Sequence, residues 1–277
     1  MSTNTANSGS LRDWILSTAR SGHGIDDIVN MMLRAGYNPR QARQIVAKTL
    51  DRPAVAFDMA MQSPGGKRTR HPEPPYQVVA GHRTEVSVCV EKPPIRVLED
   101  LLSAEECEQL IALARPRLDR SRTVNKDGSN QLDTARTSSG MFFSVGETPL
   151  IERIEHRLAE LVGLPAIHGE GLQVLHYEPG QQYEPHYDWF DPSQHGYKVL
   201  TSKGGQRVAS VIMYLNAPAN GGGTHFPKAG VTVCARRGSA VYFAYQGGDK
   251  DSLHAGLPVT EGEKWIATKW VRELPYR

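Results

Sequence analysis

The first fifty residues carry apolar side chains at helical spacing. Leu11 and Ile15 stand four positions apart, and Ile28 and Met32 repeat this interval, which places each pair on one face of a helix. We therefore expect a small α-helical module over residues 1–51. A bundle of about forty residues buries little apolar surface, so the module should depend on the rest of the chain or on a partner.

Residues 52–83 lose this periodicity. The stretch SPGGKRTRHPEPPY concentrates proline, glycine and basic residues, a composition that is typical of a linker. The basic run KRTRH could contact a phosphate backbone, but a solvated hinge is the simpler interpretation. We predict a linker over residues 52–83 and a second domain over residues 84–277.

The second domain combines two helical segments with many short β-rich runs. Ser103 and Glu106 have the spacing of a capping box, and another helix is expected to begin near Pro149. Over residues 171–273, runs such as LQVLHYE, RVASVIMYLN and SAVYFAY alternate with glycine- and proline-containing turns, a pattern typical of a sandwich or barrel. The predicted fold class is mainly β with flanking helices, with the sheet core over residues 171–273.

Composition and charge narrow the function classes. Of the 277 residues, 39% are hydrophobic and 22% are charged, as in a globular protein. The net charge of +2 gives no overall attraction to nucleic acid or to a membrane surface. The three cysteines are scattered, no apolar run is long enough to span a bilayer, and the polar start does not resemble a secretory signal. We expect a cytoplasmic protein without a membrane partner.

Two candidate metal ligands stand two positions apart in the segment EPHYDWF. His186 and Asp188 would share one face of a strand there and could bind one ion together. His254 in DSLHAG could supply a third ligand from a distant segment. Two histidines and a carboxylate form the facial triad of non-haem Fe(II) oxygenases, whose open positions fit a bidentate 2-oxo acid and dioxygen. The H-x-D pair alone is weak support, because it occurs often by chance.

Lys264 strengthens this interpretation. It lies ten residues after His254, at the start of the strand-like run KWIATKW. If its ammonium group is buried there, it would pair with the far carboxylate of 2-oxoglutarate more strongly than a solvated cation would. The four residues together predict an oxygenase that depends on Fe(II) and 2-oxoglutarate.

Four blocks of sequence resemble, in order, the catalytic domain of prolyl 4-hydroxylases: YEPGQQYEPHYDWF, GGQRVASVIMYLN, GGGTHFP and SLHAGLPVTEGEKWIATKW. The stretch TARTSSGMFF at 134–143 is similar to the family's segment beside the substrate channel. The resemblance begins near residue 95 and implies a double-stranded β-helix, or jelly-roll, catalytic domain. It also implies Fe(II), 2-oxoglutarate and O2 as reactants, succinate and CO2 as co-products, and L-ascorbate as the reductant.

The resemblance carries roles to individual residues. It implies three iron ligands, which are His186, Asp188 and His254. It makes Lys264 the anchor of the distal 2-oxoglutarate carboxylate and adds hydroxyl hydrogen bonds from Tyr177 and Thr224, although these two could also be an ordinary strand residue and a loop residue. Arg207 in GGQR is similar to a family arginine near the peptide substrate, yet arginines at strand ends are usually solvated.

The predicted activity is hydroxylation of prolyl residues in a peptide or protein. A nucleic-acid demethylating oxygenase would share the triad and use the KRTRH run, but such enzymes typically bind 2-oxoglutarate with arginine, so Lys264 disfavours nucleic acid as a partner. A third alternative is a non-catalytic protein that senses iron or 2-oxoglutarate. The protein substrate and a protein partner for residues 1–51 stay open.

Overall fold

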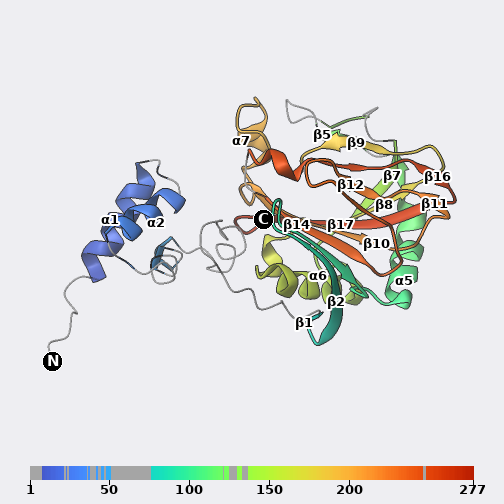
Figure 1. The fold of residues 1–277 in the computed structure, drawn as a ribbon, viewed down its shortest axis with the longest axis horizontal. Coiled ribbons are helices and arrows are strands. Elements are labelled where there is room, and N and C mark those ends of the chain that lie inside the picture. The colour runs from blue at the N-terminus through green and yellow to red at the C-terminus, as the bar shows by residue number, and fades with distance from the viewer. Residues whose placement is uncertain are drawn as a thin grey trace. The chain divides into compact units, whose positions relative to one another are not determined.

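The chain forms two compact units, Met1–Pro64 and Gly65–Arg277 (Figure 1). The computed structural model describes residues 8–21, 23, 25–35, 37, 42, 45–46, 48–50, 76–120, 122–124, 130–132, 137–245 and 248–277. Most of the predicted linker lies outside these residues. In the part of the chain so described, no helix has both the length and the apolar character needed to cross a membrane.

The first unit contains the helices α1 (Ser8–Arg20) and α2 (Ile25–Arg34), which lie where the apolar spacing predicts helix. Their inward faces meet in a small buried cluster, formed by Ile15, Ile28, Val29, Met32, Ala42 and Val46. None of these described residues is aromatic, so the part of the cluster that they form buries a modest apolar area.

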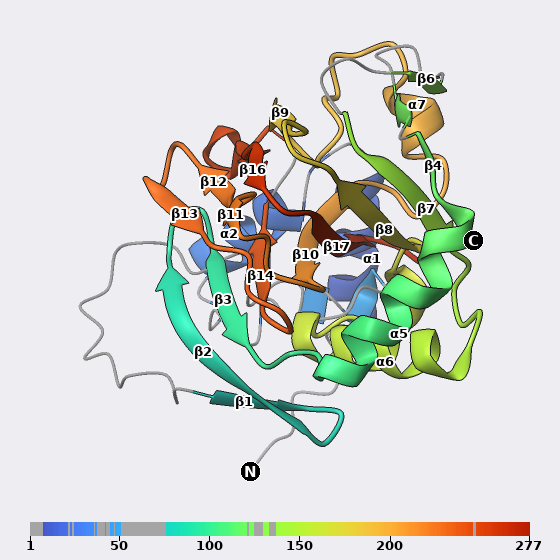
Figure 2. The same cartoon turned by 90° about the vertical axis from the view of Figure 1, so that its right-hand side faces the viewer.

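The second unit is built on a nine-stranded antiparallel sheet in the order β1-β2-β3-β14-β10-β17-β8-β7-β4 (Figure 2). Its strands are β1 (Tyr76–Val79), β2 (His82–Val90), β3 (Ile95–Glu99), β4 (Asp119–Arg120), β7 (Ser139–Phe143), β8 (Leu172–Tyr177), β10 (Arg207–Tyr214), β14 (Ala240–Ala244) and β17 (Lys264–Arg272). The long strands β10 and β17 lie near its centre and pair over most of their length.

A smaller sheet has the order β13-β12-β15-β9. Its strands are β9 (Tyr183–His186), β12 (Thr224–Phe226), β13 (Val231–Val233) and β15 (His254–Gly256). Two further short pairs are formed by β11 (Asn220–Gly221) with β16 (Val259–Glu261), and by β5 (Arg122–Val124) with β6 (Asn130–Leu132).

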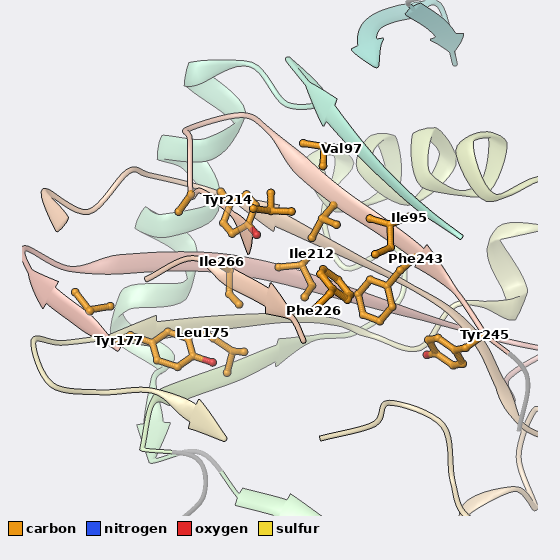
Figure 3. Close-up of a cluster of buried hydrophobic side chains, with 14 residues drawn as sticks. Ile95, Val97, Leu175, Tyr177, Ile212, Tyr214, Phe226, Phe243, Tyr245 and Ile266 are labelled. Atoms are coloured by element: carbon orange, nitrogen blue, oxygen red, sulfur yellow. The ribbon is translucent and has the colours of Figure 1, made fainter. Parts of the chain in front are cut away.

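Buried side chains from both sheets form one core (Figure 3). Leu175 and Ile266 enter it from the large sheet, and Phe226 and Val233 enter it from the small one. Two sheets packed on a shared apolar core are a jelly-roll arrangement, so the predicted fold class, mainly β with flanking helices, is confirmed.

The helices α5 (Ala104–Ala114) and α6 (Pro149–Val162) pack outside the large sheet. Lys269 of β17 points away from the core and forms a buried ion pair of 2.6 Å with Glu155 of α6. Three short turns of 3-10 helix, η1 (Arg115–Arg117), η2 (Ala166–His168) and η3 (Lys250–Ser252), and the one-turn helix α7 (Tyr197–Leu200) complete the unit. The outer helices leave the inner face of β17 to the core and the candidate site.

The large sheet begins earlier in the chain than residue 84. Strands β1 and β2 form a hairpin in which Val79 lies opposite His82. Ala80 and Gly81 make the turn, both with positive φ, which matches the type I′ turn that suits a two-residue hairpin. Four residues are too short to show a clear alternation, and for this reason β1 falls inside the predicted linker over residues 52–83.

The predicted capping box is present at the start of α5. The Ser103 hydroxyl accepts a hydrogen bond from the Glu106 amide, and the Ser103 amide donates to the Glu106 carboxylate. The same carboxylate binds the guanidinium of Arg157 in α6 at 2.7 and 2.9 Å, with both side chains about nine-tenths buried. Glu106 therefore joins the two outer helices.

We expect Glu106→Ala to lower the free energy of unfolding by about 3 kcal/mol, because the buried Arg157 charge keeps the Leu101 carbonyl but loses its carboxylate partner. Ser103→Ala is the matched control, since it removes only the cap and should cost about 1 kcal/mol. Denaturant unfolding of both variants measures the difference. Equal losses would mean that the Arg157 pair adds nothing beyond the cap.

Candidate active site

Three side chains with metal-ligating atoms meet at the small sheet. His186 is the last residue of β9, Asp188 follows two positions later, and His254 is the first residue of β15. The two strands pair antiparallel, with His254 directly opposite His186. One ligand atom from each of the three residues lies within 4.8 Å of the others. The structure thus brings together the three metal ligands that the resemblance implies.

Hydrogen bonds orient both imidazole rings. The Nδ1 atom of His186 lies 2.8 Å from the Glu184 carbonyl oxygen, and that of His254 lies 3.0 Å from the Ser252 carbonyl oxygen. A carbonyl can only accept, so Nδ1 carries the proton in both rings, and Nε2 is the atom that can ligate a metal. Each Nε2 lies 3.6 Å from an oxygen of Asp188.

Aromatic side chains pack against both imidazoles. Tyr183 stacks on His186 with ring centroids 3.6 Å apart, and the Phe243 ring meets His254 edge-on at 4.6 Å. These contacts restrict rotation of the rings, so the two ligand nitrogens are held in place before a metal binds.

The Asp188 carboxylate is buried and ionised. Burial raises its pKa, but the neighbouring imidazoles of His254 and His186 favour the charged form more strongly, and the net pKa is lowered to about 2. The Ser210 hydroxyl donates to Asp188 Oδ2 at 2.6 Å and itself lies 2.8 Å from the Tyr245 hydroxyl. This chain fixes the orientation of the carboxylate, as outer hydrogen bonds do in metal sites.

Lys264 places a buried cation near the three ligands. Its side chain is almost fully buried, its Nζ donates to the Gly222 carbonyl at 3.0 Å, and it lies 4.2 Å from the centre of the Tyr177 ring. Within the described part of the chain, no carboxylate forms an ion pair with this ammonium. Burial alone lowers its pKa, to about 8. A buried cation without an acidic partner fits an anionic ligand.

Thr224 and Tyr214 form a buried polar pair between the two sheets. Thr224 is buried on β12 opposite Gly256 of β15. The Tyr214 hydroxyl donates to Thr224 Oγ1 at 2.6 Å, and burial raises the pKa of Tyr214, so it stays a donor. Thr224 can then donate its own hydroxyl hydrogen elsewhere. A Cβ on Gly256 would stand 3.7 Å from Lys264 Nζ, which shows how closely β15 approaches the ammonium.

Arg207, the predicted substrate contact, is bound within the protein. Its guanidinium makes two hydrogen bonds to Glu170 at 2.6 and 2.9 Å, and a third to the main-chain oxygen of Asp188 at 3.3 Å. It also lies 4.0 Å from the centre of the Trp270 ring, and Arg272 shares the Glu170 carboxylate. In this position Arg207 supports the backbone at a metal ligand, and a substrate contact by it stays a prediction.

The structure also places His176 and part of the TARTSSGMFF stretch. His176 points to the outer face of the large sheet, where it stacks on Trp265 and binds Glu263 at 2.7 Å, so it lies away from the ligand set. Residues 134–136 of the TARTSSGMFF stretch lie outside the described residues. Further along it, the Thr137 hydroxyl pairs with the backbone of Gln182.

Sequence reasoning missed several supporting residues of the site. Ser210 and Tyr214 stand four apart on β10, so strand alternation could have placed both on one face. Tyr183 stands inside a block that resembles the prolyl 4-hydroxylases, three residues before His186. Glu170 carries no motif or periodic signal, because only the folded chain brings it to Arg207.

Comparison with known proteins assigns the chain to a family. Residues 172–272 match the family model described as the 2OG-Fe(II) oxygenase superfamily. Probable prolyl 4-hydroxylase 3 of Arabidopsis thaliana is 40% identical over 210 residues, which are 67% of this chain and 71% of that protein. The chain belongs to the prolyl 4-hydroxylase family. Prolyl 4-hydroxylase 1 of the same plant is 44% identical over 201 residues, covering 65% of this chain and 69% of its own.

A solved structure supports the fold of this prolyl 4-hydroxylase. The crystal structure of the viral collagen prolyl hydroxylase from Paramecium bursaria Chlorella virus-1, in complex with 2OG, superposes with a TM-score of 0.52 at 30% identity. The match covers 67% of this chain and 99% of the viral protein. Fe(II) and 2-oxoglutarate are the cofactors of the superfamily, and the donor set found here fits both: two imidazole nitrogens and a carboxylate for the metal, and a buried ammonium for a dicarboxylate.

Proposed function

We propose that this prolyl 4-hydroxylase uses Fe(II), 2-oxoglutarate and O2 to hydroxylate prolyl residues of a peptide or protein, with succinate and CO2 as co-products. One observation carries the proposal. The ligand set of His186, Asp188 and His254 includes the first residue of β15, and the buried cation of Lys264 lies beside Gly256, the last residue of the same strand. Few other protein functions require a buried ammonium group near three metal-ligating side chains.

The spacing along β15 fits the cosubstrate. His254 and Gly256 stand two positions apart on that strand, so they face the same way about 7 Å apart. Lys264 Nζ lies beside Gly256. We infer that 2-oxoglutarate lies along β15, with its 2-oxo acid end at the metal beside His254 and its far carboxylate at Lys264 beside Gly256.

Each residue has a defined part in this proposal. When bound, Fe(II) would supply the site at which O2, the oxidant, is activated: one oxygen atom enters succinate as 2-oxoglutarate loses CO2, and the other converts a C–H bond of the proline ring into C–OH. His186, Asp188 and His254 bind the metal on one side and leave the opposite side to the cosubstrate and O2. Lys264 binds the distal carboxylate, and the hydroxyl groups of Tyr177 and Thr224 donate hydrogen bonds to it.

Three further features belong to the same proposal. L-ascorbate serves as the reductant that restores oxidised iron, as the family resemblance implies. The protein acts in the cytoplasm, as its scattered cysteines suggest. The substrate is then a proline-containing segment of a cytoplasmic protein, and the helical unit is available to bind a protein partner.

The substrate class separates this proposal from its two alternatives. The purified protein is supplied with Fe(II), 2-oxoglutarate and ascorbate, together with either a proline-rich peptide or a methylated oligonucleotide. Succinate release and gain of one oxygen atom by the peptide are expected. Turnover with the oligonucleotide alone would favour a nucleic-acid demethylase, and binding of 2-oxoglutarate without turnover of either substrate would favour a sensor.

We expect His186→Ala, Asp188→Ala and His254→Ala each to abolish peptide hydroxylation, because two remaining ligands cannot keep the facial geometry. Metal binding measured by calorimetry with Mn(II) should also be lost. His225→Ala is the control, since this histidine binds Thr232 on the exposed side of β12. Full activity in any of the three ligand variants would contradict the assignment.

The affinity for 2-oxoglutarate should depend on pH through Lys264. Its pKa of about 8 in the ligand-free protein keeps the ammonium charged below that value. Above it, a proton must be taken up before the carboxylate binds, so the Kd should rise about tenfold per pH unit. Anaerobic titration with 2-oxoglutarate at several pH values between about 7 and 9.5 measures this dependence.

Lys264→Met is the control for this dependence, because it keeps most of the apolar stem of the side chain and removes the charge. We expect its Kd for 2-oxoglutarate to be about a hundredfold higher at pH 7 and to lose the step near pH 8. If the rise in Kd above pH 8 persisted in the variant, it would come from another titrating group, and Lys264 would not be the anchor.

A further inference from the structure

The end of β10 is continued by a side chain instead of by backbone. The last regular pair with β17 joins Tyr214 and Ile266, and the Leu215 amide then donates to the Trp265 carbonyl. At the next position the side chain of Asn216 takes over. Its Nδ2 donates to the Glu263 carbonyl at 2.9 Å, and its Oδ1 accepts from the Trp265 amide at 2.7 Å.

These two hydrogen bonds lie on either side of Lys264 in the chain. Glu263 and Trp265 are its neighbours in the chain, so one side-chain amide binds the backbone immediately before and after it. An asparagine amide carries one donor and one acceptor, as a peptide group does. The Asn216 side chain therefore takes the place of further β10 backbone and pairs with the chain at the start of β17.

The other edge of this segment is also held. Lys264 lies opposite Tyr177 on β8. The Glu263 carboxylate binds His176 at 2.7 Å and forms a longer ion pair with Arg115 at 3.6 Å. Asn216 is the contact that secures the side facing β10.

The position of Lys264 makes this support necessary. It is the first residue of β17 and follows a turn at Gly262 with positive φ. Strand ends open more easily than strand centres, and a buried ammonium gains hydration when it reaches water. Without a partner on the β10 side, the start of β17 would open and carry the cation away from the place where it meets an anion.

We propose that Asn216 is a positioning residue for Lys264, and that it sets the affinity for the distal carboxylate of 2-oxoglutarate without touching the metal or the peptide. This rests on the proposed function of Lys264 as the cosubstrate anchor. The side chain acts through the backbone of Glu263 and Trp265.

The test compares Asn216→Ala and Asn216→Asp with the unchanged enzyme. Asn216→Ala removes both hydrogen bonds, whereas Asn216→Asp keeps the shape and replaces the donor with an oxygen that faces the Glu263 carbonyl. In both we expect the Kd and KM for 2-oxoglutarate to rise about tenfold. The kcat at saturating 2-oxoglutarate, the KM for peptide and the affinity for Mn(II) should stay near their original values.

Thr84→Val tests whether the loss of any buried hydrogen bond in this sheet would weaken 2-oxoglutarate binding as the Asn216 variants do. Thr84 is fully buried in the same sheet and donates to the Glu99 carbonyl at 2.6 Å, far along the strand order from β17. The substitution removes a comparable hydrogen bond, so it should lower the thermal midpoint and leave the Kd for 2-oxoglutarate unchanged. If this control weakened 2-oxoglutarate binding as much as Asn216→Ala does, the positioning role would be wrong.

The double variant Asn216→Ala/Lys264→Met gives the decisive comparison. If Asn216 acts through the ammonium, removing it from a chain that already lacks Lys264 should weaken binding no further. An additional tenfold loss, or unchanged binding in both single Asn216 variants, would overturn the proposal. The proposed function fails in a different way, namely when Lys264→Met itself binds 2-oxoglutarate as tightly as the unchanged enzyme.

Discussion

A positive charge buried inside a β-sandwich is the constraint on which this site depends. Lys264 cannot leave its place without breaking the pairing of β17, which lies between β10 and β8 near the middle of the large sheet. Among the described residues no carboxylate pairs with it, and its ammonium donates to the Gly222 carbonyl. Burial of this charge destabilises the folded chain, and the binding of an anion offsets that destabilisation.

The metal ligands are constrained in a complementary way. Asp188 carries the negative charge, and both histidines are turned by backbone carbonyls so that Nε2 faces it. Around this centre, hydrogen bonds and ring contacts within the protein fix the orientation of these side chains. The site is thus organised by the fold, and cofactors need not assemble it.

Much of the fold was accessible from sequence because its signals are local. The alternation of short strands indicated the fold class, and the serine and glutamate at the start of α5 indicated its cap. The H-x-D pair was proposed from a strand period of two, although β9 ends at His186 and Asp188 lies just beyond it. The third ligand and the lysine were proposed from their residue types and positions, and the ordered blocks that resemble a family supported both. Their approach to one another could not be derived from spacing, because it depends on which strands pair.

The contacts that escaped sequence reasoning all join distant segments. Glu170 meets Arg207 and Arg272 across strands that no local pattern aligns. Asn216 meets residues 263 and 265 only because β10 ends two residues short of the start of β17. The hairpin strand β1 was missed for a different reason, since four residues carry too little alternation. Register and strand length are properties of the assembled sheet, and both were beyond the reach of a periodicity argument.

The edge position of β9 leaves one side of the site open to solvent. Among the described strands it stands at the margin of the small sheet and pairs only with β15. Its histidine is correspondingly the most open ligand, with 20% of the His186 side chain exposed, against 3% for His254. One flank of the metal centre therefore borders solvent while the other is sealed by aromatic rings. A long polypeptide can reach such a centre laterally, with no need for the sandwich to open, so a rigid scaffold is compatible with a macromolecular substrate.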